Sequence, residues 1–235
     1  MSFSDNHLFF DLDRTIWDFD LNSVETLKFI VQRENLTQLS RNFRAFHAIY
    51  KKENGKLWDA YGKGLIDKEK LRYARFENTL AKFSLYDEQL VKRFGDAYVE
   101  YSPRQTHLIP GVLQAIKELK NMGFTLHIIT NGFKEVQFLK LDNCGLSLFF
   151  NAVICSEDIG VNKPKPAIFL YACEQAKVKP SEALMIGDDY HADIHGAVSA
   201  GMKAIFYNPK KRNAYHHEHE IRHMDELVTK ILHVV

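Results

Sequence analysis

From Pro110 to Phe206 the sequence alternates short apolar runs with longer segments of helical character, and this alternation limits the fold more than any other feature. Strands that alternate with helices of this length form parallel β-α-β units in one doubly wound sheet. The predicted strands are 124–129, 152–155, 183–186 and 203–206, and the predicted helices are 112–122, 134–143, 166–177 and 193–200.

The segment before Pro110 has a different texture. A mostly apolar run at His7–Leu12 ends in carboxylates, which is typical of a further buried strand of the same sheet. From Asn22 to Ser102, Gly and Pro are scarce and apolar residues recur at helical spacing, which predicts several helices. We therefore predict an α/β fold with a doubly wound parallel sheet. Residues 1–19 and 104–235 would form its core, and residues 20–103 an inserted helical cap domain.

The composition excludes several classes of protein. The 235 residues are 46% hydrophobic and 26% charged, as in an ordinary globular protein, and the formal net charge is +1. A chain so close to neutral has no global field to attract nucleic acid or an anionic membrane. The chain has no long apolar run, its start lacks the pattern of a signal peptide, and its three cysteines lack metal-ligand spacing. We therefore expect a cytoplasmic protein that acts without nucleic acid or membrane. Whether it is a monomer or homodimer stays open.

Polar side chains follow four of the predicted strands. They are Asp11 and Asp13 at the end of the first, Thr130 and Asn131 after the second, Lys163 in the loop after the third, and Asp188 after the fourth. Each has a plainer interpretation by itself, as a helix cap, a turn or a solvated lysine. Because ligands bind at the carboxyl ends of parallel strands, we expect these side chains to converge. Clustered carboxylates repel one another unless a cation neutralises them, and an oxygen-only ligand set favours Mg²⁺.

The order of these motifs resembles the signature of the haloacid dehalogenase superfamily of hydrolases. That signature is Asp-x-Asp-x-Thr, then Thr or Ser, then Lys, then Gly-Asp-Asp, and it matches here at Asp11–Thr15, Thr130, Lys163 and Gly187–Asp189. The resemblance covers the whole chain, with the helical insertion where that superfamily carries its type 1 helical cap. The segment from Thr130 to Phe169 further resembles the branch of house-cleaning 5′-nucleotidases.

The resemblance implies an Mg²⁺-dependent phosphohydrolase that acts on a small phosphomonoester, with a nucleoside 5′-monophosphate as the expected substrate. Asp11 would be the nucleophile and would form an aspartyl-phosphate, and Asp13 would act first as general acid and then as general base. Thr130, Asn131 and Lys163 would bind the phosphate group.

The same resemblance implies the metal site. Asp11, Asp188 and the backbone carbonyl of Asp13 would hold Mg²⁺, with Asp189 or Asp193 in support. Arg14 stands where these loops often have glycine, and of its two interpretations, a solvent-facing side chain is favoured over one that reaches the substrate.

Three alternatives stay open at this stage. A 2-haloacid dehalogenase would use the same nucleophile but needs neither a metal nor Asp13. A sugar-phosphate or phosphoglycolate phosphatase would share the whole mechanism and differ only in the cap. A non-catalytic binding protein would be expected to lose the nucleophile, the acid or the metal carboxylate, and all three are present here.

Overall fold

The structure, a computed structural model, describes residues 7–212 and 214–235 and divides into two compact units. The α/β unit consists of residues 7–19 and 106–235, and the helical unit of residues 20–105. The second boundary lies beyond the expected end of the insertion because a short 3₁₀ helix, Ser102–Arg104, continues the last long helix of the helical unit.

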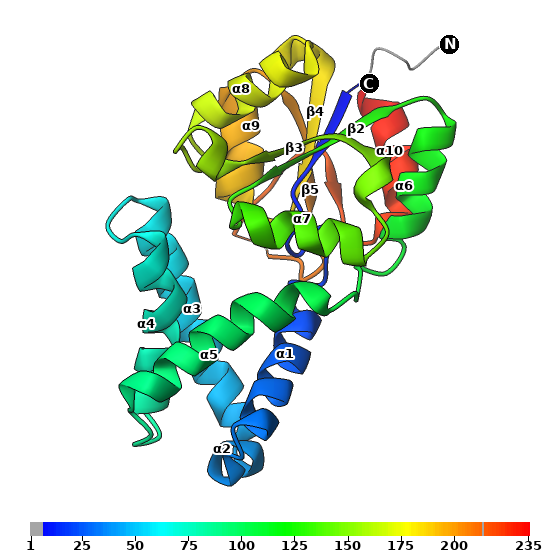
Figure 1. Ribbon diagram of the computed structural model, residues 1–235. Coiled ribbons are helices and arrows are strands. Elements are labelled where there is room, and N and C mark those ends of the chain that lie inside the picture. Colours follow the sequence, from blue (N-terminus) through cyan, green and yellow to red (C-terminus); the bar gives the residue numbers. More distant parts are fainter. Residues whose placement is uncertain (1–6, 213) are drawn as a thin grey trace. The chain divides into compact units, whose positions relative to one another are not determined.

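Six parallel strands form the sheet of the α/β unit, in the order β3-β2-β1-β4-β5-β6 (Figure 1). They are β1 (His7–Phe10), β2 (Thr125–Thr130), β3 (Phe150–Cys155), β4 (Ala183–Gly187), β5 (Lys203–Tyr207) and β6 (Glu220–Ile221). Strands β2 and β3 follow one another on one side of β1. The chain then crosses to the other side of β1, where it forms β4, β5 and β6 in turn. This reversal is a topological switch point, the place where open α/β sheets bind ligands.

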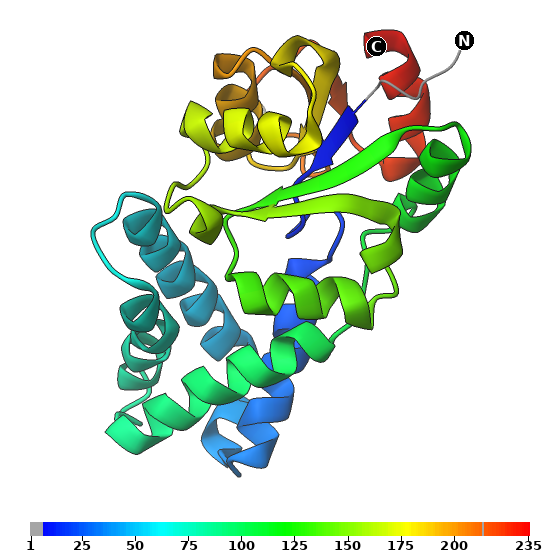
Figure 2. The same ribbon diagram turned by 45° about the horizontal axis from the view of Figure 1, so that its top comes forward.

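Helices cover both faces of this sheet, as Figures 1 and 2 show. They are α6 (Val112–Asn121), α7 (Lys134–Asn143), α8 (Pro166–Ala176), α9 (Gly196–Ser199) and α10 (Leu227–Val234). Alternate residues of β1 serve the two faces, because successive side chains of a strand point in opposite directions. Leu8 and Phe10 pack in the cluster that contains α6 and α10, whereas Phe9 packs with Phe169 of α8. The predicted doubly wound α/β fold is confirmed.

The structure differs from the predicted elements toward the C-terminus. The helix predicted from residue 193 begins earlier, as a π-helix at Tyr190–His195, and continues as α9. Neither β6 nor α10 was predicted, since no element was expected after Phe206. The short strand β6 pairs with β5, and Ile231 of α10 is fully buried in the core.

The helical unit contains only helices and turns, all within the described part of the chain. Its α-helices are α1 (Phe19–Arg33), the short α2 (Thr37–Arg41), α3 (Phe43–Gly62), α4 (Lys68–Ala81) and α5 (Glu88–Tyr101). Asp67 and Asp87 cap α4 and α5 by accepting backbone N–H hydrogen bonds, and Phe46, Phe76 and Phe94 are fully buried in its core.

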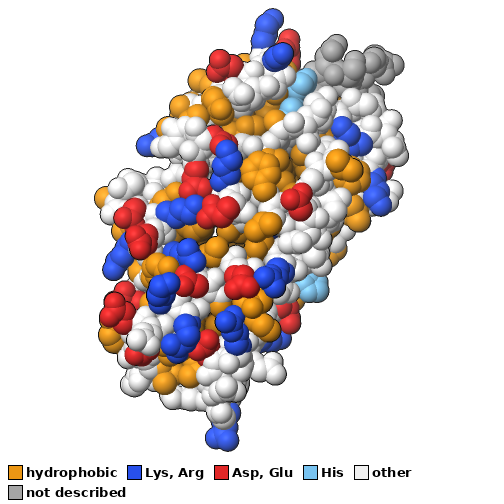
Figure 3. Space-filling model, in the orientation of Figure 1, with side chains coloured by type: hydrophobic (Ala, Val, Ile, Leu, Met, Phe, Trp, Pro, Cys, Tyr) orange, Lys and Arg blue, Asp and Glu red, His pale blue; other side chains and the backbone are white. Residues whose placement is uncertain are grey.

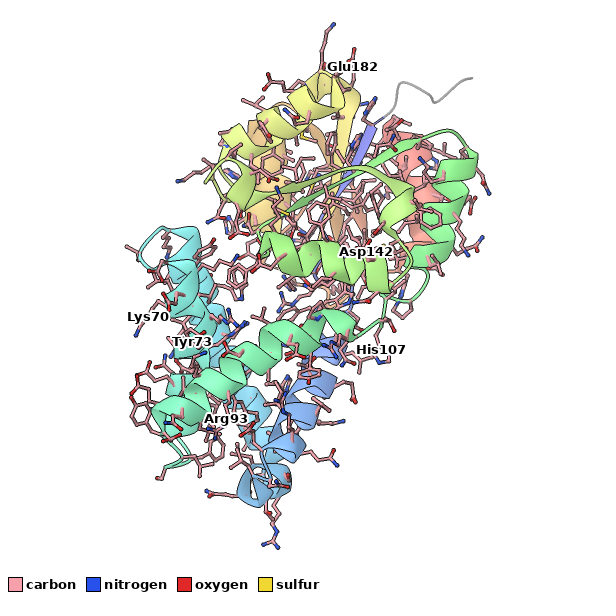
Figure 4. All side chains as sticks on the ribbon, viewed as in Figure 1. Lys70, Tyr73, Arg93, His107, Asp142 and Glu182 are labelled. Atoms are coloured by element: carbon pink, nitrogen blue, oxygen red, sulfur yellow. The ribbon has the colours of Figure 1, made fainter. Side chains whose placement is uncertain are left out.

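The surface of the helical unit carries charges of both signs, interspersed on the face seen in Figure 3. Lys70, Tyr73 and Arg93, labelled in Figure 4, belong to α4 and α5. Many of these charges form exposed ion pairs, such as Arg93 with Glu34 at 2.8 Å. In residues 7–212 and 214–235, none of the helices has both the length and the apolar character that a membrane crossing requires.

Candidate active site

Asp11 and Asp188 lie side by side at the switch point of the sheet. Asp11 follows β1 and Asp188 follows β4, and the two strands are neighbours in register. The backbone N–H of Asp11 donates to the carbonyl of Ile186 at 2.9 Å, so the strand pairing continues to the residue that carries the carboxylate. The parallel sheet therefore brings together two acids that are far apart in the sequence.

Lys163 reaches this point from the loop between β3 and α8 and is almost fully buried, at 4% exposure. Its Nζ donates to Oδ1 of Asp11 at 2.7 Å, to Oδ1 of Asp193 at 2.7 Å and to the carbonyl of Ile129 at 2.8 Å. Burial by itself would lower the pKa of Lys163, but the charges of Asp11 and Asp193 outweigh it and raise the pKa above its ordinary value. All three ammonium protons have acceptors, so the lysine is a fixed positive charge beside Asp11.

Three carboxylates gather at the same place. One oxygen from each of Asp11, Asp188 and Asp193 lies within 4.8 Å of the others. Burial, followed by the charges of Asp11 and Asp193, raises the pKa of Asp188 well above its ordinary value. The positive charges of Arg14 and of the half-exposed Arg212, which lies 3.6 Å from Asp188, offset this rise only in part. A buried carboxylate with so little compensation fits a hard divalent cation with oxygen ligands.

Asp193 and Asp189 have different tasks. Both oxygens of Asp193 have donors, since Oδ1 accepts from Lys163 and Oδ2 accepts from the backbone N–H of Asp189 at 3.0 Å. Gly187 allows this approach, because a Cβ at that position would lie 2.2 Å from Oδ2 of Asp193. The exposed Asp189 instead caps the π-helix, where its Oδ1 accepts from the N–H groups of His191 and Ala192. Of the two predicted supporting residues, it is therefore Asp193 that belongs to the cluster.

Two side chains of α7 hold the carboxylate of Asp13 by hydrogen bonds. Its Oδ1 accepts from Nζ of Lys140 at 2.6 Å, and its Oδ2 accepts from Nε2 of Gln137 at 2.9 Å. Burial would raise the pKa of Asp13, but Lys140 and Gln137 outweigh it and lower the pKa. The Lys140 ammonium also lies 4.2 Å from the centre of the Trp17 ring, a favourable cation–π distance. In this arrangement Asp13 is ionised, which is the form of a general base.

Thr130 is the last residue of β2 and Asn131 follows it, and their side chains make different contacts. The Thr130 hydroxyl accepts from Nε2 of Gln137 at 2.8 Å and from the Gly132 N–H at 3.1 Å. The Asn131 side chain forms two hydrogen bonds with the backbone of Lys163, at 2.8 and 3.1 Å. These two hydrogen bonds fasten the loop that carries Lys163 to the end of β2, and phosphate binding by Asn131 stays a prediction.

Arg14 is neither buried nor simply solvent-facing. It adopts the left-handed conformation with φ of 70°, which explains why glycine suits this position. Its guanidinium carbon lies 4.2 Å from the centre of the Phe19 ring, and its positive charge acts on Asp13 and Asp188. The half-buried side chain therefore adds a cation to the site rather than turning fully to water.

The sequence analysis missed Gln137 and Lys140. Both are buried on one face of α7 with Leu141, and they are separated by three positions, as neighbours on a helix surface are. The helix itself was predicted correctly. Two polar residues on its inward face were the available signal, because buried polar groups need partners. Asp142 belongs to the end of the same helix (Figure 4), where it accepts a hydrogen bond from Ser147.

Comparison with known proteins adds three findings. The sequence matches the model of the haloacid dehalogenase-like hydrolases over residues 6–201. It is 31% identical over 206 residues to pyrimidine 5′-nucleotidase YjjG of Escherichia coli (strain K12), covering 87% of each chain. The solved structure of the putative HAD-hydrolase YfnB from Bacillus subtilis, bound to magnesium, superimposes with a TM-score of 0.86 at 30% identity, covering 97% of this chain and 98% of that one.

A dehalogenase is also structurally similar to the chain. The crystal structure of 2-haloacid dehalogenase from Pseudomonas syringae pv. Tomato DC3000 has a TM-score of 0.66 at 27% identity, covering 98% of this chain and 99% of that one.

Proposed function

The chain belongs to the haloacid dehalogenase-like hydrolase family, and we propose that it is an Mg²⁺-dependent phosphohydrolase with Asp11 as its covalent nucleophile. The observation that carries this proposal is the cluster in which Asp11 pairs with a buried ammonium and lies beside two further carboxylates. Lys163 offsets the negative charge of Asp11, and Asp188 supplies a further oxygen for a cation. With Lys163 and a bound cation, such a site would favour an anionic phosphoryl group beside Asp11.

In the first proposed step, the Asp11 oxygen that does not contact Lys163 attacks the phosphorus atom of a phosphate ester. The bond between phosphorus and the ester oxygen breaks, and an aspartyl-phosphate forms on Asp11. Lys163 stabilises the negative charge that gathers on the phosphoryl oxygens. The hydroxyl proton of Thr130 is placed to donate a hydrogen bond to one of them.

In both proposed steps Asp13 moves the proton. As an acid it protonates the leaving oxygen, and as a base it then takes a proton from the water that hydrolyses the aspartyl-phosphate. The lowered pKa of Asp13 favours the base form. The negative charge of a bound phosphate ester would raise that pKa and so favour the acid form before the first step.

The carboxylates of Asp11 and Asp188 would hold Mg²⁺, together with the backbone carbonyl of Asp13. The fit rests on the donor set, which contains oxygen atoms only, and on the poorly compensated charge of Asp188. When bound, the ion would neutralise negative charge on the phosphoryl group. Asp193, whose oxygens are both engaged, would act by holding Lys163 in place.

The proposed substrate is a small phosphomonoester, and nucleoside 5′-monophosphates are the leading class because YjjG is a pyrimidine 5′-nucleotidase. The helical unit, inserted directly after the loop that carries Asp11 and Asp13, would act as the cap that selects the substrate. Asp13, with the two residues that hold it, supports phosphate esters over 2-haloacids, because a halide leaves without a proton.

The test is a phosphate-release screen of the purified protein with and without Mg²⁺. Its panel contains nucleoside monophosphates, sugar phosphates, phosphoglycolate and 2-haloacids, and the Asp11→Asn variant measures contaminating activity. We expect Mg²⁺-dependent phosphate release, highest for nucleotides and absent in the variant. Metal-independent halide release without phosphatase activity would show that the proposal is wrong.

A further inference from the structure

One amide group connects two functional side chains of the proposed active site. Nε2 of Gln137 donates to Oδ2 of Asp13 at 2.9 Å and to Oγ1 of Thr130 at 2.8 Å. Gln137 is fully buried on α7, so neither hydrogen bond competes with bulk water. The two partners belong to the ends of different strands, since Asp13 lies after β1 and Thr130 is the last residue of β2.

The contact with Gln137 decides which way the Thr130 hydroxyl points. A hydroxyl group has two acceptor positions and one proton. The Oγ1 of Thr130 accepts from Gln137 and from the Gly132 N–H at the same time, so both acceptor positions are filled. Its own proton must then be donated to a third group, and a phosphoryl oxygen is an acceptor of the required kind.

The orientation of the Gln137 amide is fixed by its surroundings. If the amide were turned over, its oxygen would face the carboxylate of Asp13, and two acceptors would repel each other. In the orientation observed, Oε1 is buried and has no hydrogen-bond partner among the described residues. An unsatisfied buried acceptor has a free-energy cost, so this arrangement is not explained by the stability of α7 alone.

Gly132 keeps the space that this amide occupies. A Cβ at position 132 would lie 1.7 Å from Nε2 and 2.4 Å from Cδ of Gln137. Any larger residue there would push the amide away from Thr130. The glycine after Thr130-Asn131 therefore has a steric role beyond that of a turn residue.

We propose that Gln137 is a positioning residue of the phosphatase, which holds the acid–base Asp13 and aims the Thr130 hydroxyl at the phosphoryl group through one amide nitrogen. This inference rests on the proposed function. It assigns Gln137 no contact with the substrate, so its effect must be transmitted through its two partners.

The test is a double-mutant cycle on the first chemical step. An activated aryl phosphate leaves without a proton, so its rate of Asp11 phosphorylation depends on Thr130 and not on acid catalysis by Asp13. Gln137→Met, which has similar volume and no N–H donor, should slow this step by about 10- to 100-fold, and Thr130→Val should do the same. The double variant should be within about threefold of Thr130→Val alone, because the two residues act as one unit.

Two further variants guard against damage to the fold. Gln137→Glu keeps the shape of the side chain but presents an acceptor to Asp13, and it should lose as much activity as Gln137→Met. Lys134→Met, on the same helix but exposed and paired with Asp158, should keep wild-type rates. Melting temperatures of all variants accompany the rates.

The outcomes separate this inference from the proposed function. Wild-type protein that releases no phosphate would overturn both. Two results would overturn the role of Gln137 and leave the proposed function intact. One is wild-type activity in Gln137→Met. The other is a loss of rate in the double variant that equals the product of the two single losses, because the two residues would then act independently.

Discussion

The Nζ atom of Lys163 lies 2.7 Å from Oδ1 of Asp11, and this buried ion pair joins the loop after β3 to the end of β1. Burial raises the pKa of Asp11, and the positive charge of Lys163 opposes that rise. A nucleophilic carboxylate must be ionised to attack phosphorus. Lys163 therefore favours the ionised form of Asp11 even before a substrate binds.

Replacing Lys163 by methionine should reduce both activity and stability. The carboxylates of Asp11 and Asp193 would remain buried without their cation, and we expect the free energy of unfolding to fall by about 3 kcal/mol or more. The turnover number should fall by roughly 10²- to 10³-fold, because a fixed charge at the phosphoryl group is lost. Urea denaturation and steady-state kinetics measure the two effects. Lys165→Met, exposed on the same loop, serves as control, and equal behaviour of the two variants would contradict this role.

Asp188→Asn should weaken the response to Mg²⁺ without harming the metal-free fold. The Mg²⁺ concentration for half-maximal activity should rise by about 10- to 100-fold. Because Asp188 is a buried carboxylate with little compensation, the metal-free variant should melt at the same temperature as wild type or higher. Mg²⁺ should raise the melting temperature of wild type more than that of the variant.

The control for Asp188 is its neighbour. Asp189→Asn should retain the wild-type Mg²⁺ requirement, since this side chain caps a helix and asparagine is also a good cap. If Asp189→Asn lost Mg²⁺ dependence and Asp188→Asn kept it, the assignment of the two residues would be reversed.

Asp13→Asn should discriminate between leaving groups. The leaving oxygen of a nucleotide needs a proton, so turnover of nucleotides should fall by roughly 10²- to 10⁴-fold. The first step with an activated aryl phosphate should be affected much less, because that group departs without help. Rapid-quench kinetics on both substrates separates the steps. Equal losses in the first step would remove the acid role from Asp13.

His127 should make the protein less stable in mild acid. Burial, followed by the neighbouring charges of His7 and Lys120, lowers the pKa of His127 from 6.5 to about 4. Between these values the unfolded chain binds a proton that the folded chain does not, so stability rises with pH through this window and is lost as pH falls from about 6.5 to about 4. The full difference is on the order of 3 kcal/mol.

Urea denaturation at about pH 7 and about pH 4.5 tests this linkage. His127→Phe, which can keep the stacking on Phe9, should lose less stability between the two pH values than wild type. His195→Phe, at an exposed position, should show the wild-type loss. An unchanged pH dependence in His127→Phe would assign the acid sensitivity to other groups.

The sequence predicted the main strands because each is a short apolar run with a polar end, and parallel pairing aligns those ends. For the same reason, the sequence alone predicted that Asp11, Lys163 and Asp188 lie close together. The strand β6 has only Glu220 and Ile221, and it exists through pairing with β5 rather than through a pattern of its own. The π-helix at Tyr190–His195 likewise depends on the cap formed by Asp189.

Gln137 and Lys140 could not be predicted by the same logic. They lie 124 and 127 residues from Asp13 along the chain, and their contacts depend on how α7 packs rather than on where a strand ends. The side-chain contacts of Asn131 could not be predicted for a related reason. The Asn131 side chain bonds to the backbone of Lys163, 32 residues away, and nothing at the end of a strand indicates that contact.

The central claim is that Asp11 carries the phosphoryl group during turnover. The most direct measurement is mass spectrometry of the acid-quenched protein, made with Mg²⁺ and an aryl phosphate, followed by peptide mapping. The wild type should show a small fraction, and Asp13→Asn a large fraction, of protein heavier by one phosphoryl group on the peptide that contains Asp11, and Asp11→Asn should show none. Phosphate release with no adduct in any quenched sample, or an adduct on a different residue, would contradict the account.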